Sequence, residues 1–169
     1  MAHLVTATFK DNKAAGDAVA RLKEAGYTDE ISLIAMDKNG DIKSHKIKES
    51  EIDGAMGAAA IGGVAGGLAG LLAGAGLITL PGVGTLLVAG PLAATWGLTG
   101  AAGGALTGGL VGALVDVGIS ENTAENYMDA IRRGEVLIAV KANHDSEPEI
   151  REIFDKHGAH KHETQHQTL

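Results

Sequence analysis

The sequence predicts an α+β fold in which a split β-α-β sandwich is interrupted by a long, uncharged helical hairpin. Both ends of the 169-residue chain alternate short strand-like and helix-like segments rich in charged side chains. Between Asp53 and Asp116, by contrast, 62 consecutive residues carry no charge and are mostly Gly, Ala, Leu and Val. These changes of composition divide the chain into four regions, 1–53, 54–119, 120–142 and 143–169.

The N-terminal region begins with a strand and a helix. Residues 3–9 alternate β-branched and small side chains, which is typical of a strand. Asp11 or Asn12 offers a side-chain oxygen that caps the N-terminus of a following helix. Gly26 is expected to end that helix, because glycine adopts a positive φ at little cost.

Two further strands are predicted before the uncharged block. Residues 31–36 and 42–47 are both rich in β-branched and apolar side chains. The Asn39-Gly40 pair between them favours a two-residue turn. The two segments are therefore expected to form a β-hairpin.

The sequence after the uncharged block predicts a helix, a strand and a second helix. Ser120 is placed to cap a helix that ends at Gly134, and residues 135–140 follow as a buried strand. A short helix is expected between Ser146 and Gly158, with a proline in its first turn. The order β-α-β-β, insertion, α-β matches a ferredoxin-like split sandwich whose second half is delayed.

Small residues recur at every fourth position in two parts of the uncharged block. A four-residue step places them on one face of a helix, where missing side chains let two helices approach closely. Each interior glycine costs a helix ~1 kcal/mol relative to alanine, so such regularity indicates that the close approach is used. The predicted helix-packing residues are Ala58, Gly62, Gly66, Gly70, Gly74, Gly100, Gly104, Gly108 and Gly112.

The two series are predicted to form the arms of a helical hairpin, over residues 54–77 and 92–115. Proline and glycine between the arms disfavour a continuous helix and favour a turn. Each arm would extend ~36 Å at the helical rise, which exceeds the ~30 Å core of a bilayer. The predicted turn residues are Pro81, Gly82, Gly84 and Pro91.

The apolar surface of this hairpin requires a cover. Its leucines, among them Leu68, Leu98, Leu110 and Leu114, lie off the glycine faces, and the polar flanks are too short to bury them all. Two covers remain open: other copies of the chain, in a closed or filamentous homo-oligomer, or membrane lipid. Glycine and alanine gain little from lipid transfer, and Trp96 is the one aromatic residue of the block, so self-association is favoured.

Overall composition excludes several classes of function. A formal net charge of −7 argues against nucleic-acid binding, because neutralising phosphates requires a basic surface. The absence of cysteine excludes disulfides and thiolate metal sites. The N-terminus lacks the apolar run of a secretory signal, so a cytoplasmic location is expected, with membrane association through the hairpin as the alternative. No catalytic arrangement of side chains is recognised, so neither catalytic residues nor a cofactor are expected.

Four histidines near the C-terminus are the candidate metal ligands. Imidazoles this close together are able to chelate zinc, nickel or copper. The same segment is rich in Lys, Glu and Gln, a composition typical of a solvated tail, so no metal is assigned. The four residues are His157, His160, His162 and His166.

Three segments carry a resemblance to a known family. The chain opens with VTATFKDNKAAGDAVARLKEAGY, continues with the glycine-rich block, and returns to charged sequence with AENYMDAIRRGEVLIAV. Over residues 4–142 this layout resembles the bacterial general stress and low-temperature-induced proteins with a glycine-zipper insertion. The resemblance implies a stress-associated protein without enzymatic activity, and it supplies no catalytic residues.

The predicted function is therefore that of a non-enzymatic structural protein that self-assembles through its glycine hairpin. Two alternatives stay open. In one, the hairpin enters a membrane; in the other, the sandwich or the histidine-rich tail binds a small ligand or a metal ion.

Overall fold

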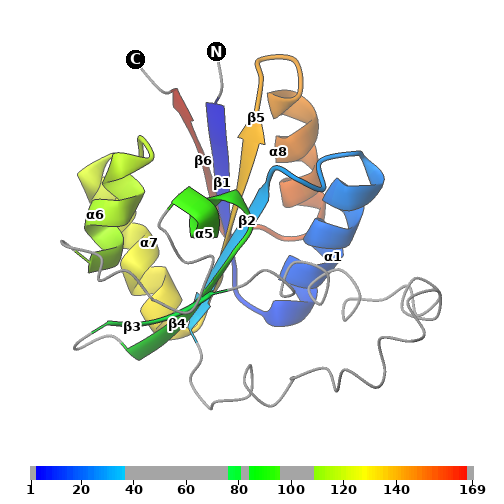
Figure 1. Ribbon diagram of the computed structural model, residues 1–169. Helices are drawn as coiled ribbons and strands as arrows, with labels where there is room; N and C mark the ends of the chain where they lie inside the picture. The colour runs from blue at the N-terminus through cyan, green and yellow to red at the C-terminus, as the bar shows by residue number, and fades with distance from the viewer. Residues whose placement is uncertain (1–2, 37–75, 81–83, 96–108, 167–169) are drawn as a thin grey trace, which may run out of the picture.

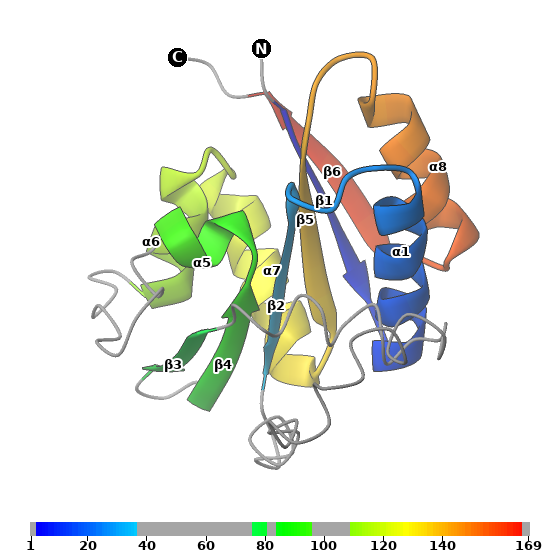
Figure 2. The same cartoon turned by 45° about the vertical axis from the view of Figure 1, so that its right-hand side comes forward.

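A computed structural model describes residues 3–36, 76–80, 84–95 and 109–166 and shows one six-stranded sheet with helices on both faces (Figures 1 and 2). The strand order is β3-β4-β2-β5-β1-β6, and every pairing is antiparallel. The predicted α+β class is confirmed. In chain order the elements are β1 (His3–Phe9), α1 (Asn12–Glu24), β2 (Ile31–Met36), β3 (Gly76–Leu80), β4 (Gly84–Ala89), α5 (Pro91–Thr95), α6 (Gly109–Asp116), α7 (Glu121–Arg133), β5 (Val136–Ala142), α8 (Glu147–Lys156) and β6 (Lys161–His166).

The first strand-helix-strand unit forms as the sequence predicts. Asp11 Oδ1 accepts a hydrogen bond of 2.7 Å from the backbone N–H of Ala14 and so caps α1. Gly26 follows the end of α1 with a φ of +98°. Because β1 and β2 both pair antiparallel with β5, which lies between them, they run parallel to each other.

Part of the uncharged block belongs to the sheet, which corrects the predicted helical hairpin. Gly76 and Leu77, assigned to the first helical arm, lie in β3, and β4 joins β3 to β2. A continuous apolar run is compatible with either a helix or a buried strand, and the proline and glycine between β3 and β4 separate two strands here. The described ends of the second arm are helical, in α5 and α6.

A strand within the C-terminal segment corrects the expectation of a solvated tail there. Residues 161–166 form β6, which pairs with β1 in a register that places Thr8 opposite Lys161 and His3 opposite His166. Edge strands are held by backbone hydrogen bonds, which a polar sequence can supply without any apolar periodicity. The strand predicted over residues 42–47 lies outside the described residues.

The remaining helices begin and end largely as expected. Ser120 Oγ accepts a hydrogen bond of 3.3 Å from the backbone N–H of Thr123 at the start of α7, and Gly134 ends α7 with a φ of +98°. A proline lies in the first turn of α8. The buried strand predicted over residues 135–140 forms as β5 (Val136–Ala142), which is central in the sheet and lies between β1 and β2.

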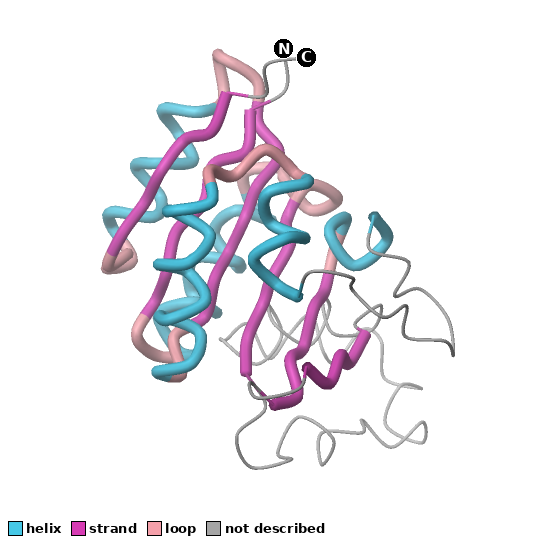
Figure 3. The backbone as a smooth tube through the Cα atoms, turned by 90° about the vertical axis from the view of Figure 1, so that its left-hand side faces the viewer, coloured by secondary structure: helices cyan, strands magenta, loops and turns pink. Residues whose placement is uncertain are grey.

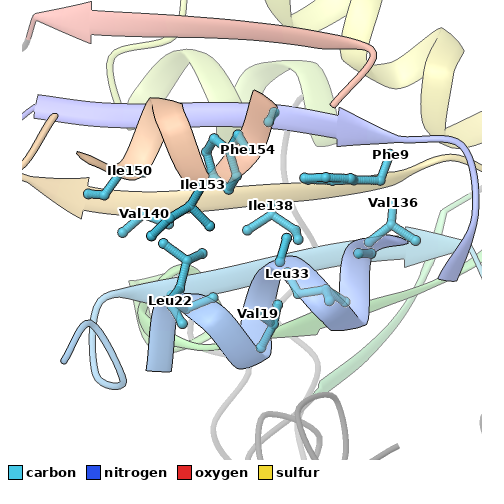
Figure 4. Close-up of a cluster of buried hydrophobic side chains, with 14 of the residues drawn as sticks. Phe9, Val19, Leu22, Leu33, Val136, Ile138, Val140, Ile150, Ile153 and Phe154 are labelled. Carbon is cyan, nitrogen blue, oxygen red and sulfur yellow. The ribbon is translucent and has the colours of Figure 1, made fainter. Parts of the chain in front are cut away.

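Two separate hydrophobic cores result, one on each face of the sheet. On the face covered by α1 and α8, the rings of Phe9 and Phe154 pack edge to face with their centroids 5.8 Å apart (Figure 4). Leu22 and Ile138 are fully buried in the same cluster. Alternate residues of β5 contribute to the opposite core, among them Leu137.

The second core lies under α6 and α7. Leu110 and Leu114 of α6 are fully buried there, together with Tyr127 of α7 and Ile34 of β2. The expectation that Leu110 and Leu114 need another copy of the chain or lipid is therefore wrong, since the chain itself covers them.

Candidate functional site

An open cleft of about 670 Å³ lies beside the carboxyl end of β5. Its walls come from the α1–β2 connection and from the β5–α8 loop, which lie near each other at one end of the sheet (Figure 2). The side chains that give it chemical character are Tyr27, Glu30, Lys141, Asp145 and Glu149.

The β5–α8 loop is shaped by its own hydrogen bonds. Asn143 Oδ1 accepts hydrogen bonds from the backbone N–H groups of Asp145 and Ser146, at 3.0 and 2.9 Å. Ser146 Oγ in turn accepts one of 2.9 Å from the backbone N–H of Asn143. This Asx-type turn fixes the loop before α8 begins. The amide of Asn143 therefore supports the wall of the cleft.

Tyr27 connects the two walls. Its hydroxyl donates a hydrogen bond of 2.7 Å to Glu149 Oε2, although the two residues are 122 positions apart. Burial, this hydrogen bond and the charge of Glu149 together raise the pKa of Tyr27 to about 12. Tyr27 therefore remains a neutral hydrogen-bond donor over the physiological pH range.

The charge of the cleft is negative. Three carboxylates, those of Glu30, Asp145 and Glu149, face a single ammonium group, that of Lys141. A small organic or inorganic cation suits such a lining better than an anion does. No sequence motif marks these residues, because they come from segments far apart in the chain.

A second polar cluster lies at the start of β5. Glu135 is 7% exposed, and its Oε1 atom accepts hydrogen bonds from Arg133 Nε and Nη2 at 3.3 and 3.2 Å. Its Oε2 atom has no hydrogen-bond partner among the described residues and lies 3.6 Å from His160 Nδ1. The backbone N–H of His160 donates a hydrogen bond of 2.8 Å to the Thr8 carbonyl. This cluster therefore lies where β6 joins the sheet.

The four candidate metal-ligating histidines are spread over the end of α8, the α8–β6 connection and β6. His157 is the C-terminal cap of α8, His160 lies beside Glu135, and His162 and His166 belong to β6. Within the described residues there is no group of three or more His, Asp or Glu side chains placed to hold a metal ion.

Most of the predicted helix-packing residues lie outside the described residues. These are Ala58, Gly62, Gly66, Gly70, Gly74, Gly100, Gly104 and Gly108, and the predicted turn residues Pro81 and Gly82 lie outside as well. Gly112 is half-buried on α6, which packs against α7. Gly84 begins β4 and Pro91 begins α5, so neither lies in a turn between two long helices.

The sheet of the described residues, seen as a backbone tube in Figure 3, has β6 at one edge and β3 at the other, and the two strands differ in charge. At one edge, β6 has the sequence KHETQH, which contains two charged residues and no apolar one. At the other edge, β3 has the sequence GLITL, which contains no charged or basic residue. Among the described residues, β3 pairs with β4 alone.

Comparisons of the chain with protein-family models, with curated proteins and with solved structures find no match. Within the described part, no helix combines the length and the apolar character needed to cross a bilayer.

Proposed function

We propose that the protein is a non-enzymatic structural protein that associates with copies of itself through its uncharged block, as a homo-oligomer or a filament. The observation that carries the proposal is the run of 62 uncharged residues between Asp53 and Asp116. Parts of this run, in β4, α5 and α6, are buried within the domain. The glycine-laddered segments 54–75 and 96–108 make up more than half of it and contain the small residues that favour close helix packing.

We further propose that the frame around this block is a ferredoxin-like split β-α-β sandwich. The strand order β6-β1-β5-β2 supports this interpretation, as does the packing of α1 and α8 in one hydrophobic core. In this arrangement the two halves are β1-α1-β2 and β5-α8-β6, and everything between β2 and β5 is insertion. In this frame, α8 serves as the second helix and β6 as the last strand. The sequence pattern alone predicts residues 120–133 and 135–140 for these two roles.

We also propose a role in bacterial stress. The support is the resemblance of residues 4–142 to general stress and low-temperature-induced proteins. The abundance of the protein in its native cells should rise after a shift to low temperature or high salt. Unchanged abundance under both conditions would contradict this role.

Sedimentation velocity of the purified chain in detergent-free buffer tests self-association. We expect species of several copies, and we expect Gly66→Leu and Gly108→Leu to dissociate them, because a leucine side chain holds the helices apart. Ala69→Leu lies off the glycine series and is the matched control, which should leave the assembly intact. A single-copy species would refute the proposal, as would release from cell membranes by detergent alone. Equal effects of the three substitutions would refute close helix packing.

The negative cleft supports a second candidate function, the binding of a small organic cation. Putrescine is a suitable probe, because its two ammonium groups could pair with the carboxylates of Glu30, Asp145 and Glu149. Calorimetric titration should show binding that is weakened in Asp145→Asn and unchanged in Glu125→Gln, which lies on α7 away from the cleft. Heat no greater than that of dilution would dismiss this candidate.

A further inference from the structure

The two edges of the sheet are protected to different degrees against pairing with another strand. A strand at the edge of a sheet directs about half of its backbone N–H and C=O groups away from its only neighbour. Proteins commonly protect such edges with charges, prolines or bulges. In β6, Lys161 and Glu163 supply charges. In β3 there is neither a charge nor a proline, and its five residues pair with β4 in an unbroken register without a bulge.

The composition of β3 also favours strand pairing. Ile78 and Thr79 are β-branched, and such residues favour extended structure, while Leu77 and Leu80 are apolar. Short segments of high β propensity and low charge are those that most readily add to another strand. Within the described residues, the edge strand that carries no charge or proline is thus also the one with the stronger tendency to pair.

We propose that β3 pairs antiparallel with β3 of a second copy, which joins two six-stranded sheets edge to edge about a two-fold axis. Such a contact is self-complementary: Ile78 lies opposite the partner's Ile78, and Leu77 lies opposite the partner's Thr79. Every opposed pair is neutral, so no like charges meet across the axis. Backbone hydrogen bonds supply most of the attraction, as in other cases of strand addition.

The other edge does not suit the same contact. An antiparallel pair of β6 strands would bring charged residues into the interface, whereas the β3 pair buries only neutral ones. A second copy is therefore the occupant that fits β3, because the identical neutral strand complements it in every opposed pair. This inference rests on the proposed self-association and adds a contact at β3 to the helix contact proposed for the glycine-laddered segments.

Cysteine cross-linking tests the contact directly. The chain has no cysteine, so a single introduced thiol reports on its own position. In Ile78→Cys, the symmetric pairing brings the two thiols within reach of a disulfide, and oxidation should convert most of the protein to a covalent dimer. Thr164→Cys, on β6, is the matched edge-strand control and should remain largely uncross-linked.

A charge substitution gives a second, independent measurement. Thr79→Lys places two ammonium groups across the proposed interface and should lower the mass of the assembly at least twofold by sedimentation velocity. Thr164→Lys makes the same change at the other edge and should leave the mass unchanged. Far-UV circular dichroism and the melting temperature identify any variant that fails to fold.

The outcomes separate this inference from the proposed function. Cross-linking at position 78 together with loss of mass in Thr79→Lys supports the β3 contact. If the wild-type chain is oligomeric but neither variant departs from its β6 control, the β3 contact is refuted and self-association stands. A wild-type chain that sediments as single copies refutes both.

Discussion

Thr6 Oγ1 and Tyr127 Oη lie 2.6 Å apart and share a buried hydrogen bond between β1 and α7. The two residues are separated by 121 positions, and the whole uncharged block lies between them. The bond therefore joins the first strand of the chain to the helix that follows the block. Because both side chains are almost fully buried, it forms where water does not compete.

Tyr127→Phe should lower the free energy of unfolding by ~1–2 kcal/mol, because it removes this buried hydrogen bond. Urea denaturation of Tyr127→Phe, Thr6→Val and the double variant measures the coupling between the two side chains. We expect a coupling energy of ~0.5–1.5 kcal/mol. Strictly additive losses would show that the two hydroxyl groups do not stabilise each other.

Adjacent arginines at the end of α7 should differ in importance. Arg133 pairs with Glu135, whose side chain is 9% exposed, whereas Arg132 lies 3.8 Å from Asp129, whose side chain is 65% exposed. Loss of a partner costs more when the remaining charge is buried. By urea denaturation, we expect Arg133→Met to cost ~1–2 kcal/mol, reduced by the exposure of the arginine itself, and Arg132→Met less than ~0.5 kcal/mol. If both variants lost the same free energy of unfolding, the burial of the Glu135 carboxylate would not make its ion pair more important than that of Asp129.

Local signals account for what the sequence predicts correctly. Asp11 caps the start of α1, and Gly26 and Gly134 follow the ends of α1 and α7. Each of these signals involves only residues within about one turn of the helix end concerned. The apolar face of α7, which includes Ile131, is likewise visible as a helical period. These features need no knowledge of the rest of the fold.

Non-local pairing accounts for what the sequence does not reveal. The polar strand β6 is held by backbone hydrogen bonds to β1, and no pattern of side chains in the sequence predicts this pairing. The β3–β4 hairpin lies in an apolar run that periodicity alone does not separate from a buried helix. The candidate cleft depends on Tyr27 meeting Glu149 across 122 positions, so only the fold brings its walls together.

The ionisation of Tyr27 should be unusually delayed. In the background of Tyr127→Phe it is the only tyrosine, so the near-ultraviolet absorbance of tyrosinate reports Tyr27 alone. We expect a pKa of about 12, because burial and the hydrogen bond to Glu149 favour the neutral hydroxyl. Glu149→Gln removes the negative charge and should lower the pKa toward the ordinary ~10. An unchanged pKa in Glu149→Gln would refute this role of the carboxylate.

The same shift predicts how stability depends on pH. Because the folded pKa of about 12 exceeds the unfolded value of ~10, the folded state holds the tyrosine proton more tightly. The contribution of Tyr27 to stability is therefore complete below pH ~10 and is lost as the pH rises through about 12. Urea denaturation between these pH values should show a steeper fall for the wild type than for Tyr27→Phe. Parallel curves would contradict the linkage.

Gly90, between β4 and α5, should tolerate a side chain far less well than Gly26. Both have a positive φ, of +83° and +98°, so alanine is strained at either position. A Cβ atom at Gly90 would also overlap the Ile31 carbonyl and lie 2.8 Å from Ser32 Cα. A Cβ atom at Gly26 would have no neighbouring atom within 4 Å among the described residues. In urea denaturation, Gly26→Ala should cost ~1 kcal/mol and Gly90→Ala ~3 kcal/mol or more. Equal costs would mean that β2 and the β4–α5 connection are packed less closely than the backbone geometry requires.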